Sequence, residues 1–117
     1  MSYDVYGRIS TGAGEFAEAF EAGNYTGNCA PMWRAAISGT FDSPQNGLAS
    51  LDGSPCGSLV PVLEAALHHM DDPANRGRYE AMNPKNGWGD FDTARGYLRK
   101  ILDGCRKHPL AFLHVSH

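Results

Sequence analysis

The fold is organised around the loop sequence NPKNGWGD, residues 83–90, which separates two helical segments. Pro84 fixes its own φ, and the Asn-Gly pair that follows Lys85 readily takes the positive φ of a tight turn. Asp90 stands where a carboxylate accepts hydrogen bonds from the first turn of a following helix. The stretch therefore predicts a rigid elbow, and we keep that name for residues 83–90. It leaves Trp88 unexplained, because an indole in a loop must pack on something or stay in water.

Helical periodicity is clear directly after the elbow, over residues 91–103. The buried face of this predicted helix consists of Phe91, Ala94, Leu98, Ile101, Leu102 and Cys105. Asp90 is its predicted cap and Gly104 its predicted stop signal, and the basic residues near Gly104 suit the negative end of the helix dipole. Before the elbow, residues 73–82 predict a short helical turn whose Tyr79 and Met82 face inward.

A second long helix is predicted over residues 58–71. Its apolar stripe is Leu59, Val60, Leu63, Ala66, Leu67 and Met70, a nearly ideal helical spacing. Pro61 would break a helix that began at Ser54. If Ser58 is the N-cap, Pro61 lies at the third helical position, where no backbone hydrogen bond is lost. The helix is therefore expected to begin at Ser58.

Strand patterns lie near the two ends of the chain. Residues 3–9 and 110–115 alternate between apolar and polar side chains, which predicts strands with one buried face. Residues 15–22 place Phe16 and Phe20 four positions apart and are followed by a glycine, a pattern that predicts a short helix.

The middle of the chain predicts one further helix and a long connection. Residues 29–37 have helical spacing, with Asn28 as the predicted N-cap, a proline in the first turn and Gly39 as the closing residue. Residues 40–57 are rich in Gly, Pro, Ser and Asn, and they predict a loop with a brief ordered piece at residues 48–51.

These elements predict one domain, residues 1–117, with an α+β, two-layer fold. The N- and C-terminal strands lie in a small sheet, and three to five helices pack on one of its faces. Two strands alone seldom make a stable sheet. Either residues 40–51 add a strand, or a second subunit completes the sheet, so a homodimer is one of the expectations.

Composition excludes several classes of function. The chain has 117 residues, of which 42% are hydrophobic and 20% charged, as in ordinary globular domains. A formal charge of −3 gives no basic surface for nucleic acid. No apolar run approaches the roughly 20 residues that cross a bilayer, and the N-terminus lacks the pattern of a signal peptide. We therefore expect a cytoplasmic protein that binds neither nucleic acid nor membrane.

Polar side chains gather in two places, the cluster at residues 24–28 and the elbow. With the nearby aromatic residues they form a candidate ligand site of Asn24, Tyr25, Asn28, Trp33, Asn83, Asn86 and Trp88. Aromatic walls and amide edges suit a planar, hydrogen-bonding ligand such as a nucleotide-like molecule. The alternative is that the asparagines cap helices and fill turns while both indoles pack in the core. Contact between the two motifs in the fold would favour the ligand site.

No catalytic or metal-binding constellation is recognisable. Cys29 stands at a predicted helix N-terminus, which favours thiolate, but no partner His and acid can be assigned to it. A partly buried thiol is therefore the better interpretation. The three cysteines are expected to be reduced, since their number is odd. The five histidines have no metal-ligand spacing, so no metal and no cofactor are expected.

The motifs Asn-Tyr-Thr-x-Asn (residues 24–28) with Met32-Trp33, and Asn-Pro-x-Asn-Gly-Trp-Gly (residues 83–89), carry a resemblance. Together with the final strand after the His-Pro pair, they resemble a family of small uncharacterised proteins of actinobacterial phages and prophages. The resemblance implies a protein that works inside an infected or lysogenic bacterial cell. It implies no particular activity.

Three functional hypotheses follow. The first is a non-enzymatic phage accessory protein that binds a host protein or a small nucleotide-like ligand. The second is a small enzyme acting on a nucleotide-like or amide substrate, with Asn24, Asn28, Cys29 and Trp88 around one pocket. The third is a structural or assembly role, for which a large exposed apolar patch would be the sign.

Overall fold

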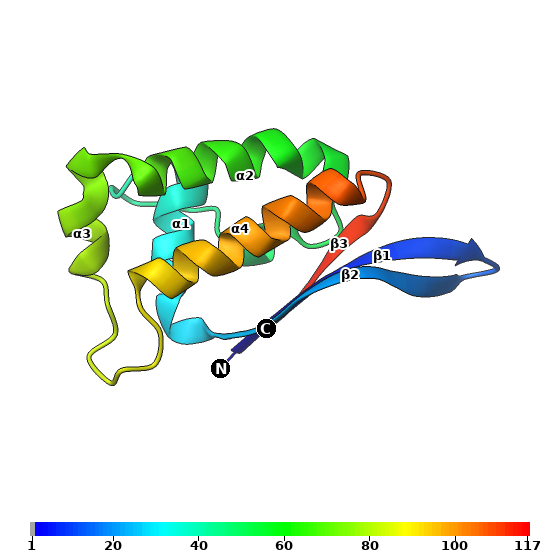
Figure 1. Ribbon diagram of the computed structural model, residues 1–117, viewed down its shortest axis with the longest axis horizontal. Helices are drawn as coiled ribbons and strands as arrows, with labels where there is room; N and C mark the ends of the chain where they lie inside the picture. Colours follow the sequence, from blue (N-terminus) through cyan, green and yellow to red (C-terminus); the bar gives the residue numbers. More distant parts are fainter. Residues whose placement is uncertain (1) are drawn as a thin grey trace.

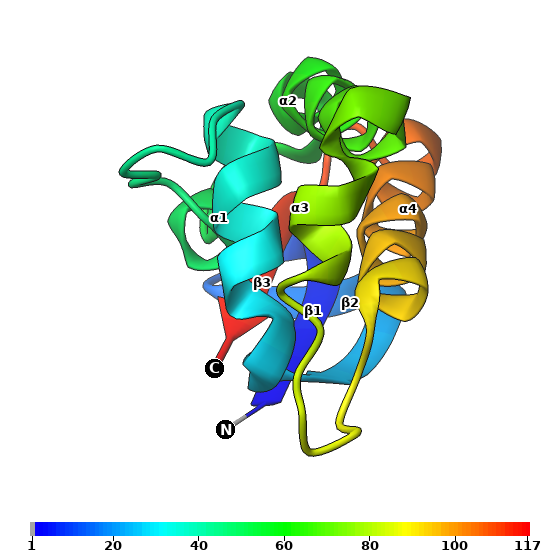
Figure 2. The same cartoon turned by 90° about the vertical axis from the view of Figure 1, so that its left-hand side faces the viewer.

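The computed structural model describes residues 2–117 and has the predicted α+β architecture (Figure 1). Its elements are β1 (Ser2–Gly12), β2 (Glu15–Thr26), the 3-10 helix η1 (Gly27–Cys29), α1 (Ala30–Ser38), the 3-10 helix η2 (Leu48–Leu51), α2 (Cys56–Asp71), the 3-10 helix η3 (Pro73–Asn75), α3 (Arg76–Glu80), α4 (Phe91–Lys107) and β3 (Phe112–Ser116). The strands form an antiparallel sheet in the order β2-β1-β3. The helices stand on one face of this sheet (Figure 2).

Strand β2 corrects the helix predicted for residues 15–22. Ala13 and Gly14 both have positive φ, 49° and 79°, and this pair of conformations closes a tight hairpin that returns the chain along β1. A bulge lies beside Ala19, because Gly7 pairs with Phe20 but Arg8 pairs with Glu18. The bulge interrupts the alternation of side chains by which a strand is recognised in a sequence. The four-residue spacing of the two phenylalanines then resembles the pattern of a helix.

The sequence predicted only two strands and left open whether residues 40–51 or a second subunit adds a third. The third strand comes from β2 within the chain itself. Residues 40–51, the other predicted source of a strand, contain only η2, which begins at Leu48 as expected for the short ordered piece. Neither predicted route to a third strand is therefore used in the fold of residues 2–117.

The ring of Phe20 joins the sheet to α4. A Cβ atom added at Gly7 of β1 or at Gly104 of α4 would collide with this ring. Gly104 was predicted to end the helix, but α4 continues to Lys107. The glycine is therefore a close-contact position inside the helix, where a larger residue would displace Phe20.

Helix α2 begins two residues earlier than the expected cap at Ser58. Its first residue is Cys56, whose N–H donates to Ala111 O at 2.8 Å, and the Gly57 N–H donates to Pro109 O at 2.9 Å. These bonds tie the start of α2 to the segment before β3. Pro61 consequently lies inside the helix, five residues after Cys56, and the predicted third position is wrong.

The remaining helix predictions are close to the structure. Helix α1 ends at a left-handed Gly39 as expected, but Thr26 rather than Asn28 caps the turn before it, accepting a bond from the Asn28 N–H. The predicted buried faces of α4 and β3 are buried, and so is Tyr79 of α3. The core between helices and sheet also includes Tyr97 of α4, which the sequence pattern did not single out.

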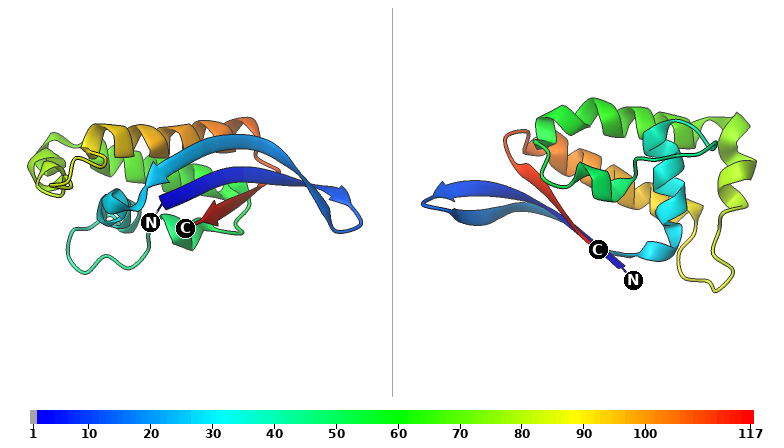
Figure 3. Two further views of the ribbon diagram at one scale, coloured as in Figure 1. Left: turned by 90° about the horizontal axis from the view of Figure 1, so that it is seen from below. Right: turned by 180° about the vertical axis from the view of Figure 1, so that it is seen from behind.

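The sheet extends beyond the helices. The tip of the β1–β2 hairpin projects past α4, and the face of the sheet opposite the helices carries no helix (Figures 1 and 3). No helix within residues 2–117 combines the length and apolar character required to span a bilayer.

Candidate functional site

The two polar motifs predicted from the sequence touch each other. Gly89 of the elbow has a φ of 93°, and a Cβ atom at this position would lie 2.8 Å from Thr26 Cγ2. The same atom would lie 2.9 Å from both Cys29 Sγ and Tyr25 Oη. The elbow backbone therefore lies directly against the cluster at residues 24–28, and only glycine fits at the contact.

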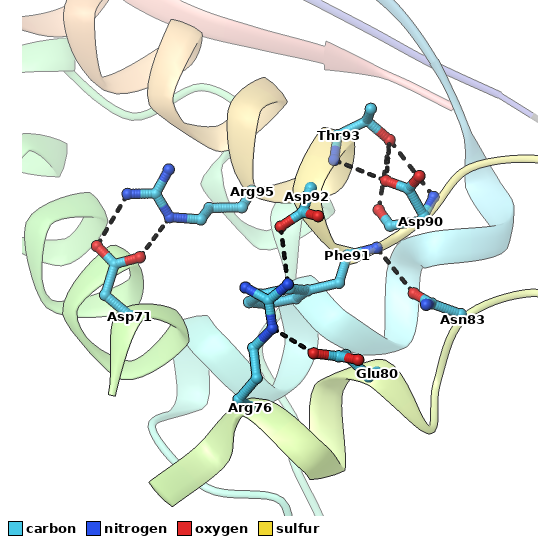
Figure 4. A network of polar contacts seen from close by, with 9 residues as sticks. All are labelled: Asp71, Arg76, Glu80, Asn83, Asp90, Phe91, Asp92, Thr93 and Arg95. Carbon is cyan, nitrogen blue, oxygen red and sulfur yellow. Dashed lines mark hydrogen bonds and ion pairs between the residues drawn. The ribbon is translucent and has the colours of Figure 1, made fainter. Parts of the chain in front are cut away.

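The hydroxyl of Tyr25 connects the cluster to the start of α4. It lies 2.6 Å from Thr93 Oγ1 and accepts a longer bond of 3.3 Å from the Asp90 N–H. Asp90 caps the helix as predicted, since its carboxylate accepts a bond from the Thr93 N–H at 2.8 Å, and the Thr93 hydroxyl completes a capping box (Figure 4). The bonds from Thr93, the backbone N–H first, lower the pKa of Asp90.

A hollow of about 340 Å³ opens where the motifs meet. It is lined by Ser2, Asn24, Tyr25, Thr26, Asn28 and Trp88. The indole of Trp88 is 68% exposed, although the Trp88 N–H donates to Asn86 Oδ1 at 3.0 Å and so fixes the loop beneath it. A rigid backbone here carries a large apolar ring into solvent at the rim of a polar hollow.

The two asparagines in the hollow keep hydrogen-bonding capacity. The Asn24 Nδ2 donates to Ser2 Oγ at 3.2 Å and to Asp4 Oδ1 at 3.1 Å, which orients the amide and leaves its oxygen without a partner among residues 2–117. The side chain of Asn28 makes no hydrogen bond to the described part of the chain. Thr26 caps η1, and Cys29 stands at the N-cap of α1 without a side-chain bond, so Asn28 does not have its predicted capping role. Both amides are exposed.

Three other residues of the predicted site have structural roles. Trp33 is completely buried, and its Nε1 donates to Ala94 O at 3.1 Å. The Asn83 side-chain oxygen accepts the Phe91 N–H at 2.8 Å and so helps to cap α4 (Figure 4). Asn86 holds the turn below Trp88. None of the three lines the hollow, which contains four of the seven predicted residues.

The thiol of Cys29 is buried rather than activated. Its side chain is completely covered, and burial raises the pKa of the Cys29 thiol despite the position before α1. Tyr25 Oη lies 3.6 Å from the sulfur. The thiol is therefore completely buried rather than partly buried as expected, and a nucleophilic thiolate is disfavoured. Cys56 and Cys105 are likewise free and buried, and burial raises the pKa of each.

A second hollow of about 360 Å³ adjoins the first and was not predicted. It shares Asn24 and Tyr25 and is otherwise lined by one side of α4: Asp92, Thr93, Gly96, Tyr97 and Lys100. A signal was present in the sequence, since Asp92, Gly96 and Lys100 are four residues apart and share one helix face. A glycine between two charged residues leaves room on that face, and no atom lies within 4 Å of a Cβ added at Gly96.

A larger hollow, about 540 Å³, lies between the end of α2, α3 and the start of α4. Its arginines are already paired. Arg95 binds the Asp71 carboxylate through two nitrogens, and Arg76 pairs with Glu80 and with Asp92 (Figure 4). A charged ligand would have to displace these internal partners, so this hollow is a weaker candidate than the one beside Trp88.

The histidines do not form a common site. His108 stacks on Phe20, while His114 packs on Tyr6 and His117 on Tyr3. His69 lies with its Nδ1 2.5 Å from the Tyr79 hydroxyl. Within residues 2–117 no group of three or more His, Cys, Asp or Glu side chains is arranged to hold a metal ion.

Comparison with known proteins gives no assignment for this site. No family model, no curated protein and no solved structure matches the chain. The interpretation of the hollow beside Trp88 therefore depends on its own geometry.

Proposed function

We propose that the protein is a non-enzymatic binder of a small, planar, hydrogen-bonding ligand of the nucleotide-like class. The ligand is taken up in the hollow between the cluster at residues 24–28 and the elbow. The observation that carries the proposal is the exposed Trp88 indole on a fixed loop, beside the amides of Asn24 and Asn28. Core packing accounts for Trp33 but gives no reason for an exposed indole at position 88.

The chemistry of the lining supports a heterocyclic base. Aromatic side chains bind bases by stacking, a contact that contributes about 1–3 kcal/mol per base. Asparagine amides offer a donor and an acceptor together and match the edge of a base. The volume of about 340 Å³ is at the lower end of the range of small-ligand pockets.

The charge around the hollow favours the neutral form of such a ligand. No Lys, Arg or His is among the lining residues. The nearest charged group bonded to the lining is the Asp4 carboxylate, which accepts from Asn24. A phosphate placed here would meet no cationic side chain among the described lining residues and would face a carboxylate. We therefore expect a base or nucleoside to bind more tightly than the corresponding phosphate.

The setting in the cell follows from the motif resemblance. We propose a phage-encoded accessory protein acting in the host cytoplasm, as the resemblance of residues 24–28 and 83–89 implies. The buried Cys29, whose pKa burial raises, supports binding without chemistry over the enzyme hypothesis, because that hypothesis placed Cys29 at the pocket and its thiolate is disfavoured.

The two tryptophans allow a direct test. Trp33 is buried and Trp88 exposed, so the long-wavelength emission belongs to Trp88. Titration with nucleosides and with their monophosphates is expected to quench this emission saturably, the nucleoside at lower concentration. Calorimetry should show loss of binding in Trp88→Ala and weaker binding in Asn28→Ala.

Asn46→Ala serves as the matched control, because Asn46 is an exposed asparagine outside every hollow described above. It should bind like the wild type. The proposal is wrong if no base or nucleoside binds the folded protein saturably. It is equally wrong if Asn46→Ala and Asn28→Ala weaken binding to the same extent.

A further inference from the structure

The sheet has one face that no helix covers (Figures 1 and 3). The strand register defines which side chains lie on it. Arg8 pairs with Phe112, Tyr6 with His114 and Asp4 with Ser116, and these pairs alternate with the buried pairs of the helix-covered side. From β2 the face receives Phe16, Glu18 and Glu21. We call this surface the open face.

One end of the open face is apolar. A hollow of about 400 Å³ is lined there by Arg8, Phe16, Asp52, Gly53, Phe112, Leu113 and His114. Phe16 is 57% and Phe112 45% exposed, although both belong to strands. The Arg8 guanidinium lies over the rings of Tyr6 and Phe16, at 5.1 and 6.0 Å from their centroids, and donates to the Tyr6 hydroxyl at 2.6 Å. Arg8 therefore extends the aromatic surface, and within residues 2–117 its positive charge has no carboxylate partner.

The other end of the open face is acidic. A hollow of about 450 Å³ is lined by Asp4, Tyr6, Glu18, Glu21, His114 and Ser116, with no lysine or arginine among them. Within residues 2–117 neither glutamate takes part in an ion pair. His114 belongs to both hollows, so the apolar and acidic ends are continuous.

We propose that the open face docks a cationic segment of a partner protein that also carries an apolar anchor. The apolar side chain enters the hollow between Phe16 and Phe112, and the cation faces Glu18 and Glu21. The Arg8–Phe112 and Tyr6–His114 pairs are two residues apart along the strands, about 7 Å. An extended segment with an apolar residue and a Lys or Arg at positions i and i+2 spans the same distance.

The charge of the open face selects this occupant over a second copy of the chain. Two copies docked face to face across a two-fold axis through the acidic end would bring the carboxylates of Asp4, Glu18 and Glu21 near their own equivalents, which is repulsive. Nucleic acid is disfavoured for the same reason. A cationic peptide is complementary to the acidic end and gives the exposed phenylalanines a partner.

Docking on the free edge of β3 is closed off by the chain itself. The Gly53 N–H donates to Leu113 O at 2.8 Å, and the Leu113 N–H donates to Ser54 O at 2.9 Å. The Val115 N–H donates to the Asp52 carboxylate at 2.8 Å. These bonds satisfy the backbone N–H and C=O groups on the outer side of β3. A partner protein can therefore bind the open face but cannot add a strand along this edge.

Defined peptides test the proposal. The probe is a fluorescein-labelled repeat of Ser-Leu-Ser-Lys, which presents Leu and Lys alternately on one side when extended. Fluorescence anisotropy with the full chain is expected to show saturable binding that weakens as salt is added. A Ser-Leu-Ser-Glu repeat and a Ser-Ser-Ser-Lys repeat should each bind much more weakly, because each lacks one of the two groups.

Substitutions assign the binding to the open face. The double variant Glu18→Lys/Glu21→Lys should lower affinity for the probe by about tenfold, since it replaces attraction by repulsion. Phe16→Ser/Phe112→Ser should also weaken binding. Asp42→Lys, a charge reversal at an exposed residue of the α1–η2 loop, should not. Circular dichroism establishes that each variant is folded.

Three outcomes would overturn the proposal. Two are equal binding of the acidic and basic probes, and a loss of binding in Asp42→Lys equal to that in the glutamate variant. The third is a wild-type dimer in ultracentrifugation that Phe16→Ser/Phe112→Ser dissociates. The last result would make a second copy the occupant. The probe should bind Trp88→Phe and the wild type with equal affinity. This proposal and the ligand site beside Trp88 can therefore succeed or fail separately.

Discussion

Trp33 and Trp88 show how residues of one type acquire opposite roles from their surroundings. The first is completely covered and hydrogen-bonded to Ala94, whereas the second is 68% exposed on a loop. Burial rather than residue type therefore decides how far each substitution lowers the free energy of unfolding.

Substitution of each tryptophan by alanine should separate these roles. Trp33→Ala is expected to lower the free energy of unfolding by about 3–5 kcal/mol, the usual loss for a buried aromatic side chain. Trp88→Ala should change it by no more than about 0.5 kcal/mol, as for other exposed positions. Urea unfolding measures both. A large loss for Trp88→Ala would show that the indole packs as core and would remove the reason to place a ligand beside it.

Gly89 and Gly87 form a second matched pair. Both have positive φ, 93° and 77°, but only a Cβ at Gly89 would meet neighbouring atoms, those of Tyr25, Thr26 and Cys29. Gly87→Ala should cost about 1 kcal/mol through backbone strain alone. Gly89→Ala should cost more than about 2 kcal/mol, because steric overlap adds to the same strain. Equal losses in urea unfolding would mean that the two motifs are not in contact.

At the scale of elements, α2 contains an internal proline whose position the structure assigns. Pro61 lies five residues after the first residue of the helix, so it has no N–H to donate to Gly57 O. Its ring also crowds that carbonyl. The helix keeps its length because its start is tied to the segment before β3 by the Cys56 and Gly57 N–H groups.

Pro61→Ala is therefore expected to stabilise the protein, by about 1–2 kcal/mol after allowance for the more flexible unfolded chain. Thermal unfolding should show a higher midpoint. Pro31→Ala is the control, because Pro31 lies in the first turn of α1, where no intrahelical bond is missing. A neutral or destabilising Pro61→Ala would contradict the assignment of Pro61 to the helix interior.

At the scale of the whole molecule, two carboxylates link acid stability to the packing of α4. Arg95 on α4 binds Asp71 at the end of α2, and this bond lowers the pKa of Asp71. The Thr93 N–H does the same for Asp90 at the start of α4. A carboxylate with a lower pKa in the folded state contributes stability above its unfolded pKa, about 3.9, and loses it as pH falls through the folded value.

The free energy of unfolding should therefore fall as pH decreases below about 4. Asp71→Asn and Asp90→Asn should each be less stable than wild type at neutral pH and should approach it in acid. Urea unfolding between neutral pH and the acid range measures the difference. Asp42→Asn is the control, because no hydrogen bond or ion pair holds the Asp42 carboxylate within residues 2–117. A constant gap between Asp71→Asn and wild type at every pH would exclude this ion pair as the cause.

The sequence by itself determined the elements whose signals are local. Helical periodicity and the Asp90 cap defined α4, alternation defined β1 and β3, and Gly39 marked the end of α1. These features depend on side chains within a few positions of one another, so the order of residues is sufficient. The same holds for the elbow, whose turn residues and cap follow from backbone conformation alone.

Tertiary structure decided the features that depend on a distant partner. Residues 15–22 carry a helix-like spacing but become β2, because pairing with β1 outweighs a weak local preference. Gly104 reads as a stop signal, yet it lies inside α4 to admit the ring of Phe20. Pro61 lies deep in α2 because bonds to the segment before β3 fix where that helix begins.

The candidate site also has features that the sequence predicted and features that only the tertiary structure decided. Sequence identified both polar motifs, and four of the seven predicted residues line the hollow beside Trp88. It could not tell that Thr26 would cap the turn and leave the Asn28 amide free, or that Trp33 would be buried. Contact between residues 24–28 and 83–90 requires the whole chain to fold, since more than fifty residues separate them and local conformation does not bring them together.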